Sequence, residues 1–351
     1  MKTLASILAL ALMLPGAPAQ KPSAPKPPPP AAAADTETAD PAGAARAAIA
    51  RGEHAAAIRL LDRAIKDGDA DALFLRAQML ETGQGGDANL VQAADLYKRG
   101  SLMGHPRSQL AYGRFLLAGL GGLTKDPSKG RSLIKGASDK GIAAAQVLVA
   151  NWLEDGTGVE KNPAAAAALY QKAAAMKNPD ALLGLARLHD AGLGGLEKNP
   201  DQATALCREA AELGSVLAIN EMGLRYQRGT GLVQDNVAAI GWFNLAAQKG
   251  LAEAQVNIGR CYETGNGVLP DLEVAMANYD AAALQGNARA YQFLGSVAER
   301  GLSGQEDRVA AYVNYARAAA AGLQEAATKR DAAAKLLSEA ERSRAEAELK
   351  H

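Results

Sequence analysis

Few residues of this sequence have the types and spacing that enzyme chemistry requires. Its four histidines, His54, His105, His189 and the terminal His351, stand apart from one another. The His-Glu-x-x-His pattern, which holds zinc on one face of a helix, does not occur, and neither does the Gly-x-Ser-x-Gly turn of a serine nucleophile. The sequence therefore predicts no catalytic residue, no metal site and no cofactor, and we expect the protein not to be an enzyme.

The recurring Gly-x-Gly turns are the other feature that could do chemistry, because glycine-rich loops can cradle phosphate groups. None is followed by Gly-Lys-Ser/Thr. Glycines at these turns recur instead in phase, at steps of 36 or 37 residues: Gly83, Gly119, Gly156, Gly192, Gly229, Gly265 and Gly301. Such a period indicates a repeat architecture with turn glycines rather than a nucleotide site.

Composition narrows the class of partner and of fold. The 351 residues carry 38 basic and 38 acidic side chains, so the formal net charge is zero. A general binder of nucleic acid or of anionic membranes would need a basic excess, and we expect neither partner. Hydrophobic residues make up 48% of the chain but aromatic residues only 4%. Small side chains must therefore fill much of the interior, as close-packed helices allow.

A second glycine series lies fifteen residues before the first: Gly68, Gly104, Gly141, Gly214, Gly250, Gly286 and Gly322. Lys177 interrupts it, and we expect the following Asn178 to adopt the left-handed conformation instead. Between the two series, small residues recur eleven and six positions before each first-series glycine, on one stripe of a predicted helix. Small residues on a stripe let a neighbouring helix approach closely.

The other half of each unit contains a second predicted helix. Asp126-Pro127, Asn162-Pro163 and Asn199-Pro200 each place a capping side chain before a proline at a helix start. Seven positions before the second-series glycine stands a larger side chain: Leu61, Tyr97, Ile134, Tyr170, Cys207, Phe243, Tyr279 and Tyr315. Each unit is thus a helix, a turn and a helix that bury their apolar faces only by stacking.

At residues 254–268 and onward through Ala275, Tyr279, Ala282 and Gly286 the pattern resembles the Sel1-like repeat, a relative of the tetratricopeptide repeat. The resemblance covers residues 70–324 as seven units. It implies an all-α, right-handed α-solenoid of stacked helix–turn–helix repeats that acts as a protein adaptor, often in signalling or in the bacterial envelope. We interpret residues 43–69 as a degenerate N-terminal unit and residues 325–351 as C-terminal capping helices, where Ser338 and Glu341 form a capping box.

The N-terminus has the pattern of an export signal. Lys2 precedes an apolar run over residues 4–14, and small residues precede Gln20. This run is shorter than the ~20 residues that span a bilayer, so we expect residues 1–19 to be cleaved between Ala19 and Gln20 and no membrane span to remain. Residues 20–42 are rich in Pro and Ala and are expected to form a disordered linker, either a tether or a solubilising leader. The predicted location is periplasmic or secreted.

The cysteines leave a second function open. Cys207 and Cys261 stand where other repeats place apolar side chains, and a whole repeat separates their own repeats, so we expect two buried thiols without a disulfide. In the resemblance, a cysteine-rich Sel1-like subfamily binds or hydrolyses β-lactams and pairs its cysteines within each repeat. This chain lacks that pairing. A β-lactam- or peptidoglycan-directed protein remains the alternative to an adaptor.

The resemblance implies that the first helices line a concave groove for a protein or peptide partner. Polar residues nine, five and two positions before the first-series glycine are the candidate groove residues: Arg114, Asn151, Glu154, Arg187, Asp190, Asn220, Gln227, Arg260, Glu263 and Gln292. We expect Arg187 and Arg260 to be the anchors, because a guanidinium can grip a carboxylate with two hydrogen bonds. The simpler interpretation is that Arg187–Asp190 and Arg260–Glu263 are ordinary surface pairs within one helix.

Overall fold

The computed structural model describes residues 40–350, so the predicted signal peptide and residues 20–39 of the predicted linker lie outside the described residues. Over residues 40–350 the chain forms eighteen helices and no strand. They are α1 (Pro41–Ala50), α2 (His54–Lys66), α3 (Ala70–Thr82), α4 (Leu90–Leu102), α5 (Pro106–Ala118), α6 (Pro127–Asp139), α7 (Ala143–Asp155), α8 (Pro163–Ala175), α9 (Pro179–Ala191), α10 (Pro200–Glu212), α11 (Val216–Arg228), α12 (Asn236–Gln248), α13 (Ala252–Thr264), α14 (Leu272–Leu284), α15 (Ala288–Glu299), α16 (Arg308–Ala320), α17 (Gln324–Leu336) and α18 (Glu339–Glu348).

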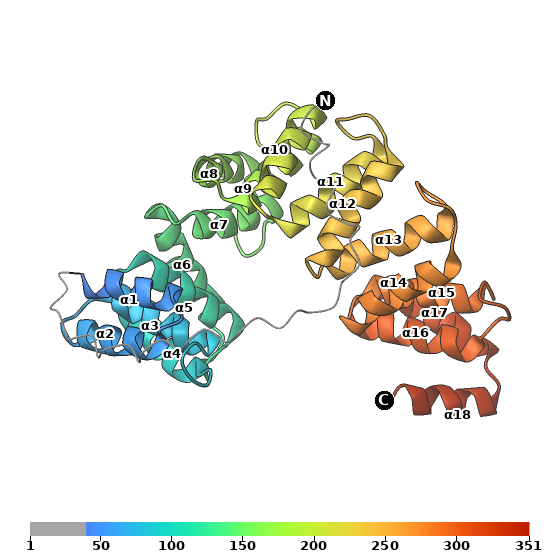
Figure 1. Ribbon diagram of the computed structural model, residues 1–351, viewed down its shortest axis with the longest axis horizontal. Helices are drawn as coiled ribbons and strands as arrows, with labels where there is room; N and C mark the ends of the chain where they lie inside the picture. Colours follow the sequence, from blue (N-terminus) through green and yellow to red (C-terminus); the bar gives the residue numbers. More distant parts are fainter. Residues whose placement is uncertain (1–39, 351) are drawn as a thin grey trace, which may run out of the picture.

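The helices stack as pairs in a curved row (Figure 1), and from α1 to α17 each packs against its neighbours along the chain. We call the first helix of each of the seven predicted units an A helix (α3, α5, α7, α9, α11, α13 and α15) and the second a B helix (α4, α6, α8, α10, α12, α14 and α16). The predicted all-α solenoid is confirmed. Side-chain contacts join the A helices of successive units directly.

The predicted capping signals set the helix boundaries. Asp126, Asn162 and Asn199 each accept a hydrogen bond from a backbone N–H of the first helical turn, and a proline follows each of them. Six of the seven A helices end at a first-series glycine with a left-handed backbone, with φ between 65° and 77°. Glycine adopts this conformation without a Cβ clash, which explains its recurrence there.

Small residues of the A helices face the bulky residue of the paired B helix, as the stripes predict. A Cβ added at Gly259 would lie 2.6 Å from the Tyr279 ring, and one at Gly223 would lie 2.5 Å from the Phe243 ring. Both distances are shorter than any contact that a methyl group can make. The aromatic rings, which are fully buried, thus take the space that the missing side chains leave.

The structure corrects the prediction for the interrupted glycine series. Lys177 itself takes the left-handed conformation, with φ 57°, and is the one non-glycine residue among the described residues that does so. Asn178 has an extended backbone instead and caps the start of α9, where its side chain accepts from Asp180 and Ala181 N–H. The N-cap role excludes the left-handed conformation at Asn178, so the turn must be made one residue earlier.

Both ends of the stack carry extra helices. α1 begins at Pro41, two residues before the predicted start of the N-terminal unit, and Asp40 caps it. α1 and α2 form a complete pair that packs on α3. At the other end α17 completes the packing of α16, and α18 lies beside α16. The predicted capping box of Ser338 and Glu341 opens α18.

Candidate functional site

Four buried tyrosines of the B helices end on acidic side chains of the A helices. The hydroxyl of each donates a hydrogen bond of 2.6 to 2.8 Å to the glutamate sixteen residues before it. The pairs are Tyr97–Glu81, Tyr170–Glu154, Tyr279–Glu263 and Tyr315–Glu299. Each ring is at most 1% exposed, whereas the carboxylate lies at the A-helix surface. Two of the candidate groove residues, Glu154 and Glu263, therefore have a structural role as partners of buried hydroxyls.

The three repeats without this tyrosine also lack the glutamate. Where the B helix carries Ile134 or Phe243, the matching A-helix position, two residues before the first-series glycine, holds Leu117 or Gln227. The fourth repeat has Cys207 and Asp190 at these positions. A carboxylate in this column is thus present where a hydrogen-bond donor reaches it, which is a signal that a comparison of the two columns in the sequence could have found.

In the fourth repeat an arginine from the next A helix takes the place of the tyrosine hydroxyl. Arg225 is 2% exposed and donates to both Asp190 carboxylate oxygens and to Thr204 Oγ1 at 3.1 Å. Glu221, one turn away, lies 3.6 Å from its Nε. Cys207 leaves room for this guanidinium because it is smaller than the tyrosine of the other repeats. Arg225 is not among the residues predicted from the sequence, although it stands at a repeat position that is apolar in the other units.

The candidate arginines and acids pair between repeats rather than within one helix. Arg187 Nη2 lies 2.9 Å from Glu154 Oε2 and 3.1 Å from the Tyr170 hydroxyl. Glu263 accepts from Arg300 Nη1 at 3.1 Å. The interpretation of Arg187–Asp190 and Arg260–Glu263 as surface pairs within one helix is therefore wrong. Each acid lies close to the next repeat, because successive A helices lie side by side. It therefore pairs with an arginine of that repeat.

Most other candidates are also engaged inside the chain. Asn257 Nδ2 donates to Asn220 Oδ1 at 2.9 Å, and both side chains are buried. Gln292 Nε2 donates to Glu325 at 3.0 Å, Gln227 Nε2 lies 3.6 Å from the Cys261 sulfur, and Asn151 Oδ1 lies 2.5 Å from the Tyr170 hydroxyl. The contacts of Asn220, Gln227 and Gln292 link one helix pair to the next, whereas Asn151 joins the two helices of the third repeat. Together they rigidify the A-helix surface.

Two candidate arginines keep their charge unpaired on that surface. Arg114 in α5 is exposed, and within residues 40–350 it makes no ion pair or hydrogen bond through its side chain. Arg260 in α13 is also exposed, and its guanidinium lies over the Phe293 ring, 5.5 Å from the centroid. Stacking on an aromatic face holds the guanidinium in place while its N–H groups stay free. Of the two predicted anchors, Arg260 is thus available to a partner and Arg187 is engaged by Glu154.

The electrostatics of Glu154 follow from these contacts. Partial burial favours the neutral acid, but the hydrogen bonds from Arg187 and Tyr170 outweigh it, and the pKa of Glu154 is lowered. Burial of the Tyr170 hydroxyl and its bond to Glu154 raise the pKa of Tyr170. The acid is thus ionised and the tyrosine neutral at physiological pH, which is the state that the hydrogen bond needs.

The cysteines are free thiols, as predicted. Cys207 and Cys261 are both buried and unbridged. Burial raises the pKa of Cys207 to about 11 and also raises the pKa of Cys261. Thiols that stay protonated inside the fold are poor nucleophiles. Among the described residues, no group of three or more His, Cys, Asp and Glu side chains could hold a metal ion.

Paired helices that pack through equivalent residues in one repeat after another define the chain as an α-solenoid repeat protein. Seven consecutive segments, residues 70–105, 106–142, 143–178, 179–215, 216–251, 252–287 and 288–323, match the model of the Sel1 repeat. The chain belongs to the Sel1 repeat family, whose fold is typical of protein-interaction scaffolds.

Solved structures agree with this assignment. A protective antigen of uropathogenic Escherichia coli with an SLR fold is 28% identical, with a TM-score of 0.66 over 84% of this chain and 63% of that one. A Sel1 repeat protein from Oxalobacter formigenes is 28% identical, with a TM-score of 0.61 over 72% of this chain and 100% of that one. The chain thus spans less than two thirds of the first protein and all of the second. A comparison with curated proteins finds no match.

Within residues 40–350 no helix combines the length and the apolar character that crossing a bilayer needs.

Proposed function

We propose that the protein is a non-enzymatic scaffold that is exported to the envelope of a bacterium and binds a protein or peptide partner along its A-helix surface. The observation that supports this most is the row of A helices held in register by side-chain links between repeats. A surface that is already ordered loses little conformational entropy when a partner binds. Family membership adds that such repeats serve in interaction scaffolds.

Arg114 and Arg260 are the proposed contact residues for the partner. Both are exposed on A helices, and neither has a carboxylate partner among residues 40–350. Arg187, the other anchor that the sequence predicts, is not among them, because it is already bonded to Glu154 and Tyr170. A guanidinium that is exposed and unpaired can form two parallel hydrogen bonds to a partner carboxylate without first breaking an internal contact.

Capture from an envelope extract tests the binding surface. The mature wild-type protein and the Arg114→Ala/Arg260→Ala variant are crosslinked to the extract, and recovered proteins are quantified by mass spectrometry. The matched control is Arg99→Ala/Arg208→Ala, which removes two exposed arginines from the B helices α4 and α10. We expect the A-helix variant to lose a partner that the control retains. Equal recovery by both variants would show that these arginines do not contact the partner.

Export is proposed from the N-terminal sequence, with its charged start, its apolar run and the small residues before Gln20. Cell fractionation followed by N-terminal sequencing tests it. We expect the protein in the periplasm or the medium, beginning at Gln20. Uncleaved protein that stays in the cytoplasm would contradict the proposed location.

The alternative, a β-lactam- or peptidoglycan-directed protein, gains no support from the cysteines. They are buried in different repeats rather than paired within one. A nitrocefin hydrolysis assay and a muropeptide release assay separate the two functions. The scaffold proposal expects no turnover above the rate without protein, and turnover that follows the purified protein would refute its non-enzymatic part.

A further inference from the structure

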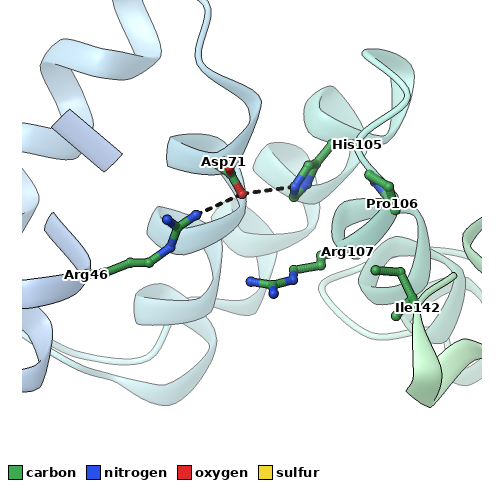
Figure 2. Close-up of a pocket in the computed structure, with 6 residues that line it drawn as sticks. All are labelled: Arg46, Asp71, His105, Pro106, Arg107 and Ile142. Atoms are coloured by element: carbon green, nitrogen blue, oxygen red, sulfur yellow. Dashed lines mark hydrogen bonds and ion pairs between the residues drawn. The ribbon is translucent and has the colours of Figure 1, made fainter. Parts of the chain in front are cut away.

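A basic cavity lies near the N-terminal end of the stack, outside the groove residues considered so far. It has a volume of about 500 Å³ and is lined by Arg46, Asp71, His105, Pro106, Arg107 and Ile142. These residues come from α1, the start of α3, the start of α5 and the turn before α7, as Figure 2 shows. Two guanidiniums, one imidazole and a single carboxylate thus surround one space.

Hydrogen bonds fix the wall of this cavity. His105 caps α5, where its Nδ1 accepts from the backbone N–H of Ser108, so the neutral ring carries its proton on Nε2. That nitrogen lies 3.1 Å from Asp71 Oδ1, and Arg46 Nη2 lies 3.1 Å from the same oxygen. Asp71 is thus shared between two donors on the wall.

The cations of the cavity exceed its anions. Asp71 balances one of the two guanidiniums, and Arg107 makes no ion pair or hydrogen bond through its side chain within residues 40–350. Asp69 also lies near His105, but it does not line the cavity, and its carboxylate caps α3 by accepting from Ala72 N–H at 3.0 Å. In Figure 2 the Arg107 guanidinium points into the space between Arg46 and Ile142. One guanidinium is therefore free to bind an anion there.

We propose that this cavity binds a glutamate side chain of an acidic peptide segment in a partner protein, with Arg107 as the main contact and Arg46 as the second. The carboxylate would bridge the two guanidiniums, and Ile142 and Pro106 would contact the methylene groups of the glutamate. The volume of about 500 Å³ is in the range of ligand-sized pockets, so the cavity has room for the glutamate together with neighbouring residues of the peptide.

The inference deepens the proposed scaffold function by naming the chemistry of the partner, and it rests on that function. It concerns residues distinct from Arg114 and Arg260, so the two can fail separately. Loss of the cavity proposal leaves the capture experiment with the Arg114→Ala/Arg260→Ala variant unaffected.

Fluorescence anisotropy of the mature protein with a fluorescein-labelled peptide of alternating glycine and glutamate tests the cavity. The glutamine version of the peptide is the control for charge. Arg107→Gln removes the free guanidinium. Arg289→Gln is the matched protein control, because Arg289 holds the same repeat position in α15 but pairs there with Glu253 at 2.9 Å. Circular dichroism checks that both variants fold.

We expect wild-type protein and Arg289→Gln to bind the glutamate peptide equally, and the glutamine peptide far more weakly. Arg107→Gln should weaken binding by about tenfold or more, as the loss of a charged two-bond contact does. Unchanged binding by Arg107→Gln, or equal binding of both peptides, would overturn the proposal. Inorganic phosphate is the competitor, and displacement by phosphate as effective as that by unlabelled peptide would assign the cavity to free anions instead and also overturn it.

Discussion

The Tyr170→Phe variant removes one hydroxyl. It tests the link between the A-helix surface and the seam, which is the buried contact between the paired A and B helices. The Tyr170 ring is fully buried, and its hydroxyl lies 2.5 Å from Asn151 Oδ1, 2.6 Å from Glu154 Oε2 and 3.1 Å from Arg187 Nη2. Phenylalanine keeps the ring in the seam, and Phe243 shows that the fold accepts it there. The variant therefore removes the hydrogen bonds and little else.

A hydrogen bond to a charged group contributes about 1.5–3 kcal/mol. The hydroxyl donates its one proton to the carboxylate, the stronger acceptor, and its oxygen accepts from Arg187 Nη2 at 3.1 Å, so the variant loses both bonds. The longer bond costs less to lose, because Arg187 keeps its bonds to Glu154. Arg187 still neutralises Glu154, and we expect the free energy of unfolding to fall by about 1.5–3 kcal/mol. Urea denaturation, monitored by the circular dichroism of the helices, measures this change. An m-value equal to that of the wild type shows that unfolding exposes the same surface in both proteins.

Tyr226→Phe is the matched control, because this tyrosine is half-buried and its hydroxyl makes no hydrogen bond within residues 40–350. It should change the free energy of unfolding by less than about 0.5 kcal/mol. If Tyr170→Phe lowers the free energy of unfolding no more than this control does, the Tyr–Glu hydrogen bonds do not hold the A and B helices together, and the reasoning is refuted.

Three further perturbations test the rest of the account. Lys177→Gly should stabilise the fold by up to about 1 kcal/mol. A left-handed backbone costs a non-glycine residue about 1–2 kcal/mol, and the greater freedom of glycine in the unfolded chain offsets about 0.4–1 kcal/mol of the gain from removing that cost. A lower melting temperature would contradict this prediction. Ala173→Leu should cost about 1–3 kcal/mol, since Ala173 is fully buried in the seam; an unchanged melting curve would mean that the seam lies elsewhere. Glu154→Gln should flatten the acid limb of the stability profile. The pKa of Glu154 is lowered in the fold, so its contribution is complete above the ordinary glutamate pKa and is lost as pH falls through the folded value; an acid limb identical to that of the wild type would refute this.

The sequence predicts the seam well because seam residues repeat. Gly259 stands at a repeat position that is always small and Tyr279 at one that is mostly large, so phase alone places them opposite one another. The capping residues are equally local. Asn162 accepts from a backbone N–H three residues on, and no distant contact enters that prediction.

Contacts between repeats could not be predicted in the same way. Arg187 and Glu154 lie 33 residues apart, and the angle between successive repeats decides whether they meet. The same holds for Arg46, Asp71 and His105, which come from three different helix pairs. Arg225 could in principle be predicted from the sequence, because a charged residue at an otherwise apolar repeat position must have buried polar partners. The sequence feature that points to Arg225 is Cys207, because its small side chain leaves the space that Arg225 fills.

Site-specific photocrosslinking tests the claim that the A-helix surface is the binding surface most directly. A photoreactive phenylalanine analogue placed at Arg260 in α13 is compared with the same residue placed at Arg208 in α10, each in the mature protein within living cells. The account predicts a discrete crosslinked species from position 260, lost when Arg114 is also changed to alanine, and none from position 208. Crosslinking from position 208 but not from position 260 would contradict it.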